Sequence, residues 1–567
     1  MLNGNPVGLD EINDETLKDL LSWMLKLQPE ERPSANEALT HPFLCHDEKF
    51  HFYVNIETIH HDLCHNQNHF IRLADKAYFI KTFPVFFVRL HAAVRSNEDL
   101  KNKPKLKEQW KYIDESTKHR ELLLKLIEYG RNPTVEVKVV GNVRVIFSEE
   151  FCIGEGSDAT RVYLGLGKDG YGKAVKRIHR YKFVQLAHHK KKILNKFNAK
   201  KSKYVVNYFY LEEDTGTEYV YLILDLCEES LESFVKSSTL NDLQKALPDI
   251  LRQILKGLAD LHRCPNPILH RDLRPSNVLR DSKSKFLIAD FGISRILKDD
   301  STTYESNSSM GTVHWIAPES YCEDDDSGYK ACYNRRSDVY NAGMVAYYVA
   351  TKGKHPFGTK LYRQINMLKG NPVGLDEIED ETLKDLLSWM LNLKPEDRPY
   401  SNEALKHPFL MSDDEKFQML CKVGNLQQIK TNDPQSSVVQ KLNSESVYWK
   451  SQMDWNVYDY FRTYEENGKI SKVRYKSSWP ECLRFIRNID QHWNDLPRPL
   501  PQPEPFYKIG DYRAYFLRTF PNLPVQVHAA VRSNEELKTN QNSRTFLILM
   551  KANYINKQFR YNRTCWG

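Results

Sequence analysis

The chain has 567 residues, a hydrophobic fraction of 41%, a charged fraction of 27% and a formal net charge of +7. This composition is typical of a soluble globular protein with room for several domains, and it excludes a disordered or fibrous chain. The ten cysteines form no C-x-x-C pair and no run of eighteen apolar residues occurs, so we expect reduced thiols, no membrane span and a cytoplasmic location.

The chain begins with a partial copy of its own later sequence. Residues 1–44 match residues 367–410 at an offset of 366, with eight differences, and residues 77–101 match residues 514–538 at an offset of 437. The change of offset means that roughly seventy residues of the later copy are missing, whereas repeat architectures need complete stacked units. We interpret residues 1–101 as a truncated duplicate left by a tandem duplication or by a fusion of gene models. The alternative is a decoy that docks where the true C-terminal elements dock.

A glycine-rich stretch indicates a phosphate-binding loop. Gly154 and Gly156 lie in IGEGSDATRV, which ends at Val162, while Ala159 stands where a third glycine is expected. Glycines let backbone N–H groups approach phosphate oxygens, and Lys176 on the next apolar segment can neutralise the charge.

The helix expected next lacks an acidic residue. It extends from Tyr181 to Phe197, where an active protein kinase needs a glutamate that pairs with the strand lysine. His189 or Lys190 stands near that position, and a cation there would repel Lys176. We therefore expect nucleotide binding without fast phosphoryl transfer.

An apolar strand, Leu222 to Cys227, leads into a predicted hinge. The backbone of Asp225 to Cys227 would meet the edge of an adenine ring.

The stretch ILHRDLRPSNVLRDSKSKFLIADFG carries three polar residues in a fixed order. In phosphoryl transfer, Asp272 would supply a carboxylate near the attacking hydroxyl, and Asn277 and Asp290 would supply oxygen ligands for magnesium. The three residues have the spacing of a protein-kinase catalytic loop and magnesium loop. Arg274 replaces the usual lysine. These residues predict a cleft for ATP or ADP with Mg²⁺.

The following sequence also has the order of a kinase fold. Glu319 closes a Ser/Thr-rich loop that is either solvated or a phosphorylation switch, and Arg398 is its expected partner. The sequence from Ser337 to Tyr340 is predicted to open a long buried helix.

Organised sequence continues beyond Leu410. A helix is predicted from Pro480 to about Trp493, because proline is favoured in a first turn. On it Asn488 and His492 are four residues apart and share a face, beside Arg487 and near the phenol of Tyr475. These groups suit metal-free RNA cleavage, in which a ribose 2′-hydroxyl attacks the adjacent phosphorus with help from a base and an acid. By itself, such a helix face is more often simply solvated.

Several passages together resemble the kinase-extension nuclease family over about residues 142–540. They are LHRDLRPSN, IADFG, GTVHWIAPE, KPEDRPYSNEALKHPF, FIRNIDQHW and AYFLRTFPNL. The resemblance implies that Tyr475, Arg487, Asn488 and His492 are the nuclease residues, with His492 as the general acid and Tyr475 as the base. It also implies that ATP or ADP stabilises a back-to-back homodimer whose two extensions form one RNA site.

The expected fold class is α+β, a bilobal protein-kinase-like fold followed by an all-α nuclease extension and preceded by the truncated duplicate. The expected parts are the duplicate (1–101), a charged linker (102–141), the kinase-like domain (142–410), the ribonuclease domain (411–540) and a tail (541–567). The predicted function is an endoribonuclease that needs no cofactor for RNA cleavage, binds no DNA, and is activated by nucleotide-dependent dimerisation. A serine/threonine kinase and a non-catalytic nucleotide-gated scaffold are the alternatives. The predicted nucleotide-binding residues are Gly154, Gly156, Val162, Lys176, Asp225, Cys227, Asn277 and Asp290.

Overall fold

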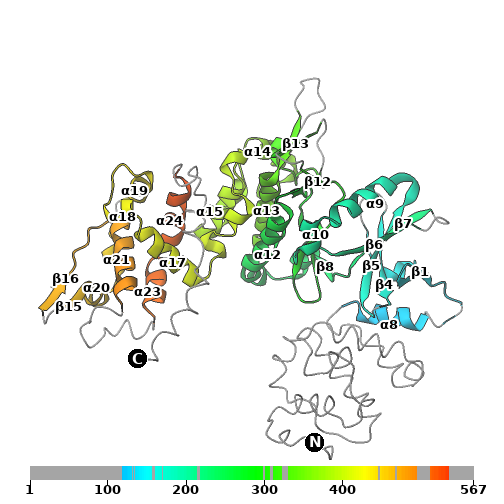
Figure 1. Ribbon diagram of the computed structural model, residues 1–567, viewed down its shortest axis with the longest axis horizontal. Helices are drawn as coiled ribbons and strands as arrows, with labels where there is room; N and C mark the ends of the chain where they lie inside the picture. The colour runs from blue at the N-terminus through cyan, green and yellow to red at the C-terminus, as the bar shows by residue number, and fades with distance from the viewer. Residues whose placement is uncertain are drawn as a thin grey trace, which may run out of the picture. The chain divides into compact units, whose positions relative to one another are not determined.

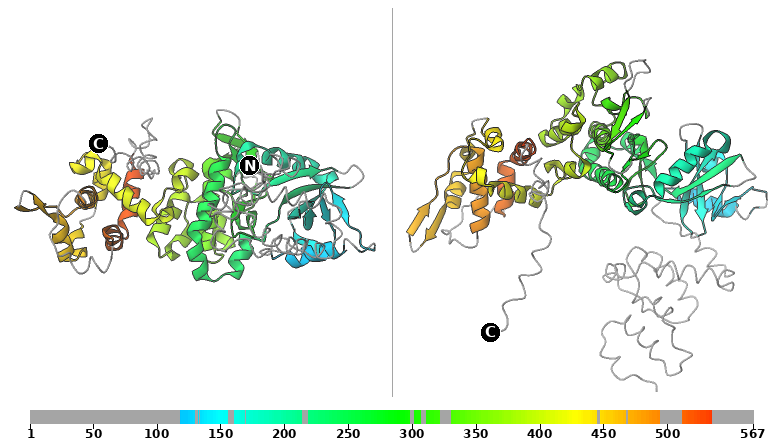
Figure 2. Two further views of the ribbon diagram at one scale, coloured as in Figure 1. Left: turned by 60° about the horizontal axis from the view of Figure 1, so that its bottom comes forward. Right: turned by 45° about the horizontal axis from the view of Figure 1, so that its top comes forward.

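The computed structural model describes residues 118–534, apart from residues 130–131, 133, 156–159, 169, 214–217, 298–300, 307–310, 322–329, 445–446, 467–468 and 494–510. The truncated duplicate therefore lies outside the described residues. The described chain divides into two compact units. The first contains the residues up to His188 together with Tyr208–Glu228, and the second contains His189–Asn207 and the residues from Glu229 onwards (Figures 1 and 2).

The first unit is built on a seven-stranded antiparallel sheet in the order β1-β2-β4-β5-β7-β6, with β3 paired to β4. The strands are β1 (Lys138–Val140), β2 (Val143–Val145), β3 (Cys152–Glu155), β4 (Arg161–Gly167), β5 (Gly172–His179), β6 (Tyr208–Glu212) and β7 (Tyr219–Asp225). Tyr163, Val175 and Ile223 are direct neighbours across three strands and are almost fully buried. Aromatic and β-branched side chains of this kind favour a pleated, buried surface.

The prediction of a linker over residues 102–141 is wrong for its second half. Residues from Lys118 are folded, and helix α8 (Arg120–Tyr129) buries Leu123 and Leu126 against Phe151 of η6 (Glu149–Phe151). The charged residues that suggested a linker cover only the outer face of this helix, because an amphipathic helix needs few apolar residues to dock.

The second unit begins with the end of α9 (Arg180–Leu194), which is shorter than the expected helix, and continues as a mainly helical domain. Its helices are α10 (Phe197–Lys201), α11 (Leu231–Ser237), α12 (Leu240–Leu261), α13 (Arg335–Ala350), α14 (Lys360–Leu368), α15 (Glu381–Met390) and α16 (Ser401–Ala404). Its short strands are β8 (Glu229–Ser230), β9 (Ile268–Leu269), β10 (Val278–Arg280), β11 (Phe286–Ile288), β12 (Arg295–Ile296), β13 (Thr303–Ser306) and β14 (Ala331–Asn334). The 3₁₀ turns are η7 (Pro275–Asn277), η8 (Pro318–Ser320), η9 (Val373–Glu377), η10 (Pro395–Asp397) and η11 (Pro408–Leu410).

Helix α13 is the long buried helix that the sequence predicted. Asn334 caps its start by accepting from the backbone N–H groups of Arg336 and Ser337, and the Ser337 side chain completes a capping box. This arrangement satisfies N–H groups that would otherwise be unpaired inside the protein.

The C-terminal extension follows in the same unit, coloured from yellow to red in Figures 1 and 2. It contains α17 (Asp413–Gly424), α18 (Gln427–Lys430), α19 (Ser437–Leu442), η12 (Trp449–Gln452), α20 (Trp455–Arg462), α21 (Trp479–His492), α23 (Tyr512–Thr519) and α24 (Leu523–Arg532). Aromatic rings dominate its core, among them Phe417, Trp449, Phe461, Phe485 and Phe516.

The extension is helical, as expected, apart from one hairpin. Strands β15 (Thr463–Glu466) and β16 (Lys469–Lys472) form an antiparallel hairpin between α20 and α21. Among the hairpin residues whose burial the structure describes, Thr463 is the one that is buried, so these residues add little to the core and form no apolar stripe that would predict the hairpin from the sequence.

No helix among the described residues is long and apolar enough to cross a membrane.

Candidate functional site

Two predicted residues of the catalytic stretch, Asp272 and Asn277, lie in the segment between β9 and β10 and contact each other there. Asn277 Nδ2 donates to both Asp272 O, at 2.8 Å, and Asp272 Oδ2, at 2.9 Å. The other carboxylate oxygen of Asp272 accepts from the Thr312 hydroxyl at 2.7 Å and from the Thr312 N–H at 3.1 Å. Asp272 is therefore positioned by the amide of Asn277 and by the loop around Thr312.

A buried aspartate beneath this loop fixes its backbone. Asp338 accepts from the N–H groups of His270 and Arg271, at 2.9 and 2.8 Å, and its Oδ2 lies 2.9 Å from His262 Nε2. Burial alone would raise the pKa of Asp338, but these hydrogen bonds and the neighbouring histidines hold it below its usual value. A charged, fully bonded carboxylate is a rigid support for the catalytic loop.

Asp290, the second predicted magnesium ligand, follows β11. Its backbone has a φ of 58°, and its Oδ1 lies 2.6 Å from Lys190 Nζ of α9. The lysine that stands near the expected glutamate is thus paired with the magnesium-loop aspartate. The effect that we expected on Lys176 stays a prediction, because Lys176 belongs to the other unit.

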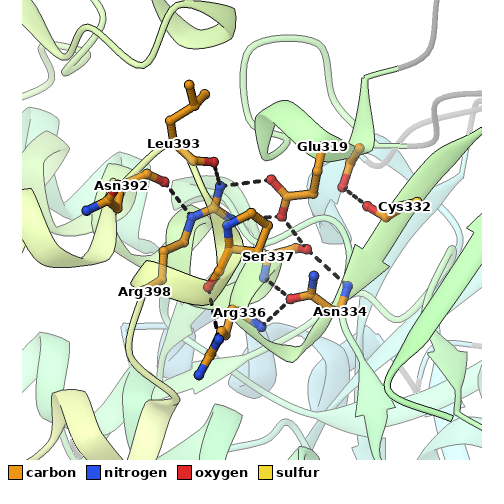
Figure 3. A network of polar contacts seen from close by, with 10 residues as sticks. Glu319, Cys332, Asn334, Arg336, Ser337, Asn392, Leu393 and Arg398 are labelled. Atoms are coloured by element: carbon orange, nitrogen blue, oxygen red, sulfur yellow. Dashed lines mark hydrogen bonds and ion pairs between the residues drawn. The ribbon is translucent and has the colours of Figure 1, made fainter. Parts of the chain in front are cut away.

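The predicted partner of Glu319 is confirmed. The Arg398 guanidinium, which is fully buried, donates to Glu319 Oε1 at 2.7 Å and to Oε2 at 2.8 Å, and it also bonds the carbonyls of Asn392 and Leu393 (Figure 3). Ser337 donates to the same carboxylate at 2.7 Å. The bidentate pair joins the end of the Ser/Thr-rich loop to the residue that follows η10, and Ser337 joins the same carboxylate to α13.

The first unit holds the remaining predicted nucleotide-binding residues. Gly154 on β3 pairs with Val162 on β4, and Lys176 lies on β5, buried at 7% exposure. Asp225 ends β7, and the carbonyl of Cys227 lies 3.3 Å from His119 Nε2. Gly156 and Ala159 lie outside the described residues.

Helix α21 carries three of the four candidate nuclease residues, Arg487, Asn488 and His492, and confirms the predicted helix to within one residue at each end. Asn488 Nδ2 donates to Tyr475 Oη at 2.9 Å, so a residue of the loop before the helix meets a residue in the last turns of the helix, one turn before its end. Burial raises the pKa of the Tyr475 phenol, although the hydrogen bond from Asn488 acts in the opposite direction. His492 lies one turn beyond Asn488, at the last residue of the helix, and is exposed.

Arg487 lies beside this pair with an unused donor. Its NH1 bonds Gln491 Oε1 at 2.6 Å, while its Nε is buried and has no hydrogen-bond partner among the described residues. Burial and the nearby charge of Arg484 lower the pKa of Arg487. Because this Nε is buried, only the outer part of the guanidinium could meet an anion such as a phosphate.

Residues that the sequence reasoning missed hold this site in place. Trp449 Nε1 donates to Lys476 O at 3.0 Å, and Lys450 donates to the carbonyl of Tyr475, which fixes the loop. At the helix end Tyr512 donates to Asp490 at 2.8 Å and its ring stacks on Trp493 at 4.5 Å. These partners come from η12 and α23, which are distant in sequence, and no local pattern marks them.

Comparisons with known proteins agree with both halves of this arrangement. Residues 147–410 match the family described as Protein kinase domain, and residues 416–545 match the family described as Ribonuclease 2-5A. A protein kinase domain followed directly by a ribonuclease domain defines the class of protein. The chain belongs to the kinase-extension nuclease family, which joins these two domains.

Its relatives carry both activities in their names. The chain is 30% identical over 411 residues to the serine/threonine-protein kinase/endoribonuclease ire-1 of Caenorhabditis elegans, covering 68% of this chain and 39% of the relative. It is 30% identical over 420 residues to the serine/threonine-protein kinase/endoribonuclease IRE2 of Homo sapiens, covering 70% of this chain and 42% of the relative. The chain thus spans about two fifths of the length of these relatives. Protein kinase domains as a class bind a nucleotide with Mg²⁺.

Proposed function

We propose that this chain is an endoribonuclease that cleaves RNA without a metal ion, using the residues of α21 and the loop before it. The observation that carries the proposal is the hydrogen bond between Asn488 and Tyr475, with Arg487 beside it and His492 one turn further along. The match of residues 416–545 to a ribonuclease family and the names of the worm and human relatives support the same activity.

The reaction needs one proton acceptor and one proton donor. Tyr475, in its deprotonated phenolate form, takes the proton of the ribose 2′-hydroxyl as that oxygen attacks the adjacent phosphorus. His492 donates a proton to the 5′-oxygen that leaves, so the products are a cyclic phosphate and a free hydroxyl. Arg487 and Asn488 bind the phosphate oxygens, on which negative charge increases in the transition state.

The kinase domain acts on this view as a nucleotide-responsive platform. ATP or ADP bound by the predicted residues favours a back-to-back homodimer, and two ribonuclease domains then form one RNA site. A ligand shifts such an equilibrium only by its differential affinity for the two states, so hydrolysis of the nucleotide is not required.

The test is cleavage of a structured RNA by the purified full chain, with and without ADP, compared with sedimentation of the same samples. We expect ADP to increase both the dimer fraction and the cleavage rate. His492→Ala should lose cleavage, whereas Asp272→Asn and a matched control, His188→Ala at an exposed histidine, should keep it. A chain that remains monomeric in saturating ADP and leaves every RNA intact would refute the proposal.

A serine/threonine kinase is the second candidate. Asn277 donates a hydrogen bond to Asp272, and Arg398 forms the ion pair with Glu319 that the kinase order of the sequence predicted. Autophosphorylation that Asp272→Asn abolishes would favour it. If neither activity is found, the non-catalytic scaffold remains.

A further inference from the structure

The end of helix α9 is attached to the loop that contains Asp290. Lys190 Nζ donates to Asp290 Oδ1 at 2.6 Å, and the two side chains are only 6% and 27% exposed. The residue before it is also attached, since His189 Nε2 lies 2.7 Å from the Ser294 carbonyl. Two adjacent residues of α9 therefore contact the same short loop. The contact of Lys190 is thus part of how α9 packs on the loop and does not depend on the orientation of one flexible side chain.

The loop is shaped to admit the lysine. A Cβ atom added to Gly292 would lie 3.3 Å from Lys190 Cε, slightly too close to the end of the lysine side chain, and 3.5 Å from Asp290 Oδ1, an ordinary contact distance. The ring of Phe291 packs edge-on against His270, with ring centroids 5.0 Å apart, which holds the middle of the loop. The Asp290 carboxylate is thus held toward the ammonium group.

The donor set does not fit a divalent cation. Magnesium requires near-octahedral oxygen ligands and loses water reluctantly, so it needs carboxylate oxygens that are available. Here Asp290, one of the two predicted magnesium ligands, has its Oδ1 bonded to Lys190. Asp272, the other carboxylate of the catalytic stretch, is not available as a substitute ligand, because its two oxygens accept from Asn277 and Thr312. An ammonium group at hydrogen-bond distance also repels any second cation, and burial strengthens that repulsion.

We propose that Lys190 replaces the divalent cation at Asp290. The ammonium group neutralises the carboxylate and keeps metal ions out, so the magnesium site that the sequence predicted is not used in this chain. The consequence for nucleotide rests on the proposed function: ADP or ATP binds this kinase domain in the absence of Mg²⁺.

The first test uses Mn²⁺ alone, titrated into the full chain and followed by electron paramagnetic resonance. Wild type and Asp290→Asn should bind Mn²⁺ equally weakly, because Asp290 is not available. Lys190→Gln should gain a site at least tenfold tighter than wild type, and the double variant Lys190→Gln/Asp290→Asn should lose it. Lys192→Gln, which removes the same charge from an exposed position of α9, is the matched control and should behave as wild type.

The conservative variant Lys190→Arg keeps a cation at this position and should also bind Mn²⁺ weakly. The proposal is overturned if Asp290→Asn weakens Mn²⁺ binding by wild type tenfold, or if folded Lys190→Gln gains no site. The comparison of wild type with Asp290→Asn remains decisive even where Lys190→Gln fails to fold.

The second test is calorimetric titration of ADP in EDTA and in Mg²⁺. Wild type should bind with affinities that agree within about twofold, whereas Lys190→Gln should bind at least tenfold more tightly in Mg²⁺. A tenfold gain for wild type in Mg²⁺ contradicts the proposal. Neither assay measures RNA cleavage, so a chain without nuclease activity leaves the Mn²⁺ result as informative as before.

Discussion

At the scale of single residues, the environment of Tyr475 decides what its phenol can do. The side chain is 6% exposed and packs against Phe485, with ring centroids 5.0 Å apart. Burial raises the pKa of the phenol, so it is protonated at neutral pH. Since Asn488 already donates to the oxygen, the phenol's own proton must point elsewhere, and the oxygen can accept a proton only as its own departs.

We therefore expect the Tyr475→Phe variant to lower kcat/KM for RNA cleavage by about 10²- to 10⁴-fold, the usual contribution of a positioned acid or base. The cleavage rate of the wild type should rise between about pH 7 and 9, because a larger fraction of the phenol loses its proton as the pH approaches its raised pKa. The rate of the variant should not show this rise. The pH–rate profile of both proteins is the measurement.

The control is Tyr448→Phe, which removes the hydroxyl of a phenol that is 72% exposed, and it should leave the profile unchanged. If Tyr475→Phe retains the wild-type rate and profile, Tyr475 is not the base.

At the scale of elements, helix α21 divides its residues between core and site. Cys482, Leu483 and Ile486 are fully buried, while Asn488 and His492 lie on other faces. Helix α17 packs closely on α21 because Gly424 has no side chain: a Cβ there would lie 2.5 Å from the Leu483 carbonyl oxygen and 3.2 Å from Arg487 Cβ. The glycine thus sets the distance between a core helix and the helix that carries Arg487.

A Gly424→Ala substitution should push α17 away from α21, because the obstacle is backbone. We expect a loss of about 1–3 kcal/mol in the free energy of unfolding, together with slower RNA cleavage as Arg487 moves. Chemical denaturation and a cleavage assay measure the two effects. Asp413→Ala at a highly exposed carboxylate of the same helix should cost less than about 1 kcal/mol; equal losses for both variants would contradict the packing argument.

At the scale of the whole molecule, a polar joint connects the ribonuclease domain to the kinase domain within the second unit. Arg532 of α24 makes a bidentate ion pair with Asp385 of α15, with 2.7 Å between Arg532 NH2 and Asp385 Oδ1. His407 Nε2 lies 2.8 Å from the same carboxylate, and His528 packs against His407 with ring centroids 4.8 Å apart. Burial alone would raise the pKa of Asp385, but His407 and Arg532 hold it below its usual range.

The two buried histidines should make this joint sensitive to acid. Burial lowers the pKa of both His407 and His528, so the folded protein binds fewer protons on them than the unfolded chain does. The free energy of unfolding should therefore fall as pH drops below about 6.5, by up to about 1.4 kcal/mol per pH unit for each histidine. The contribution of Asp385 is lost only below about pH 4, where the unfolded carboxyl takes up its proton.

Denaturation of the full chain at several pH values between 5 and 7.5 tests this expectation. His528→Gln should reduce the pH dependence, whereas His188→Gln at an exposed histidine should leave it unchanged. If the free energy of unfolding of His528→Gln depends on pH as steeply as that of the wild type, protonation of His528 does not make the joint sensitive to acid.

The truncated duplicate repeats the sequence of this joint. The residues Asp19, His41, His91 and Arg95 stand where the later copy has Asp385, His407, His528 and Arg532. The proposal that residues 1–101 are a remnant predicts that their deletion leaves RNA cleavage and thermal stability unchanged. A higher cleavage rate after deletion would instead favour a decoy that competes for the joint.

Local patterns in the sequence determined much of this protein. The order of Asp272, Asn277 and Asp290, the pairing of Arg398 with Glu319, and the helix with Asn488 and His492 all follow from short motifs and from helical spacing. Motifs of this kind are readable because each depends on residues close in the chain or on a fixed set of partners.

Contacts between segments that are distant in the chain became known only from the three-dimensional fold. The sequence places Lys190 near the position of the missing glutamate, and only the fold shows that it pairs with Asp290, one hundred residues away. The hairpin of β15 and β16, the folded segment around α8 and the joint between Asp385 and Arg532 were likewise missed. Ion pairs and docking surfaces form between groups that are far apart in sequence, so their partners are chosen by packing and charge in three dimensions, and no periodicity along the chain records that choice.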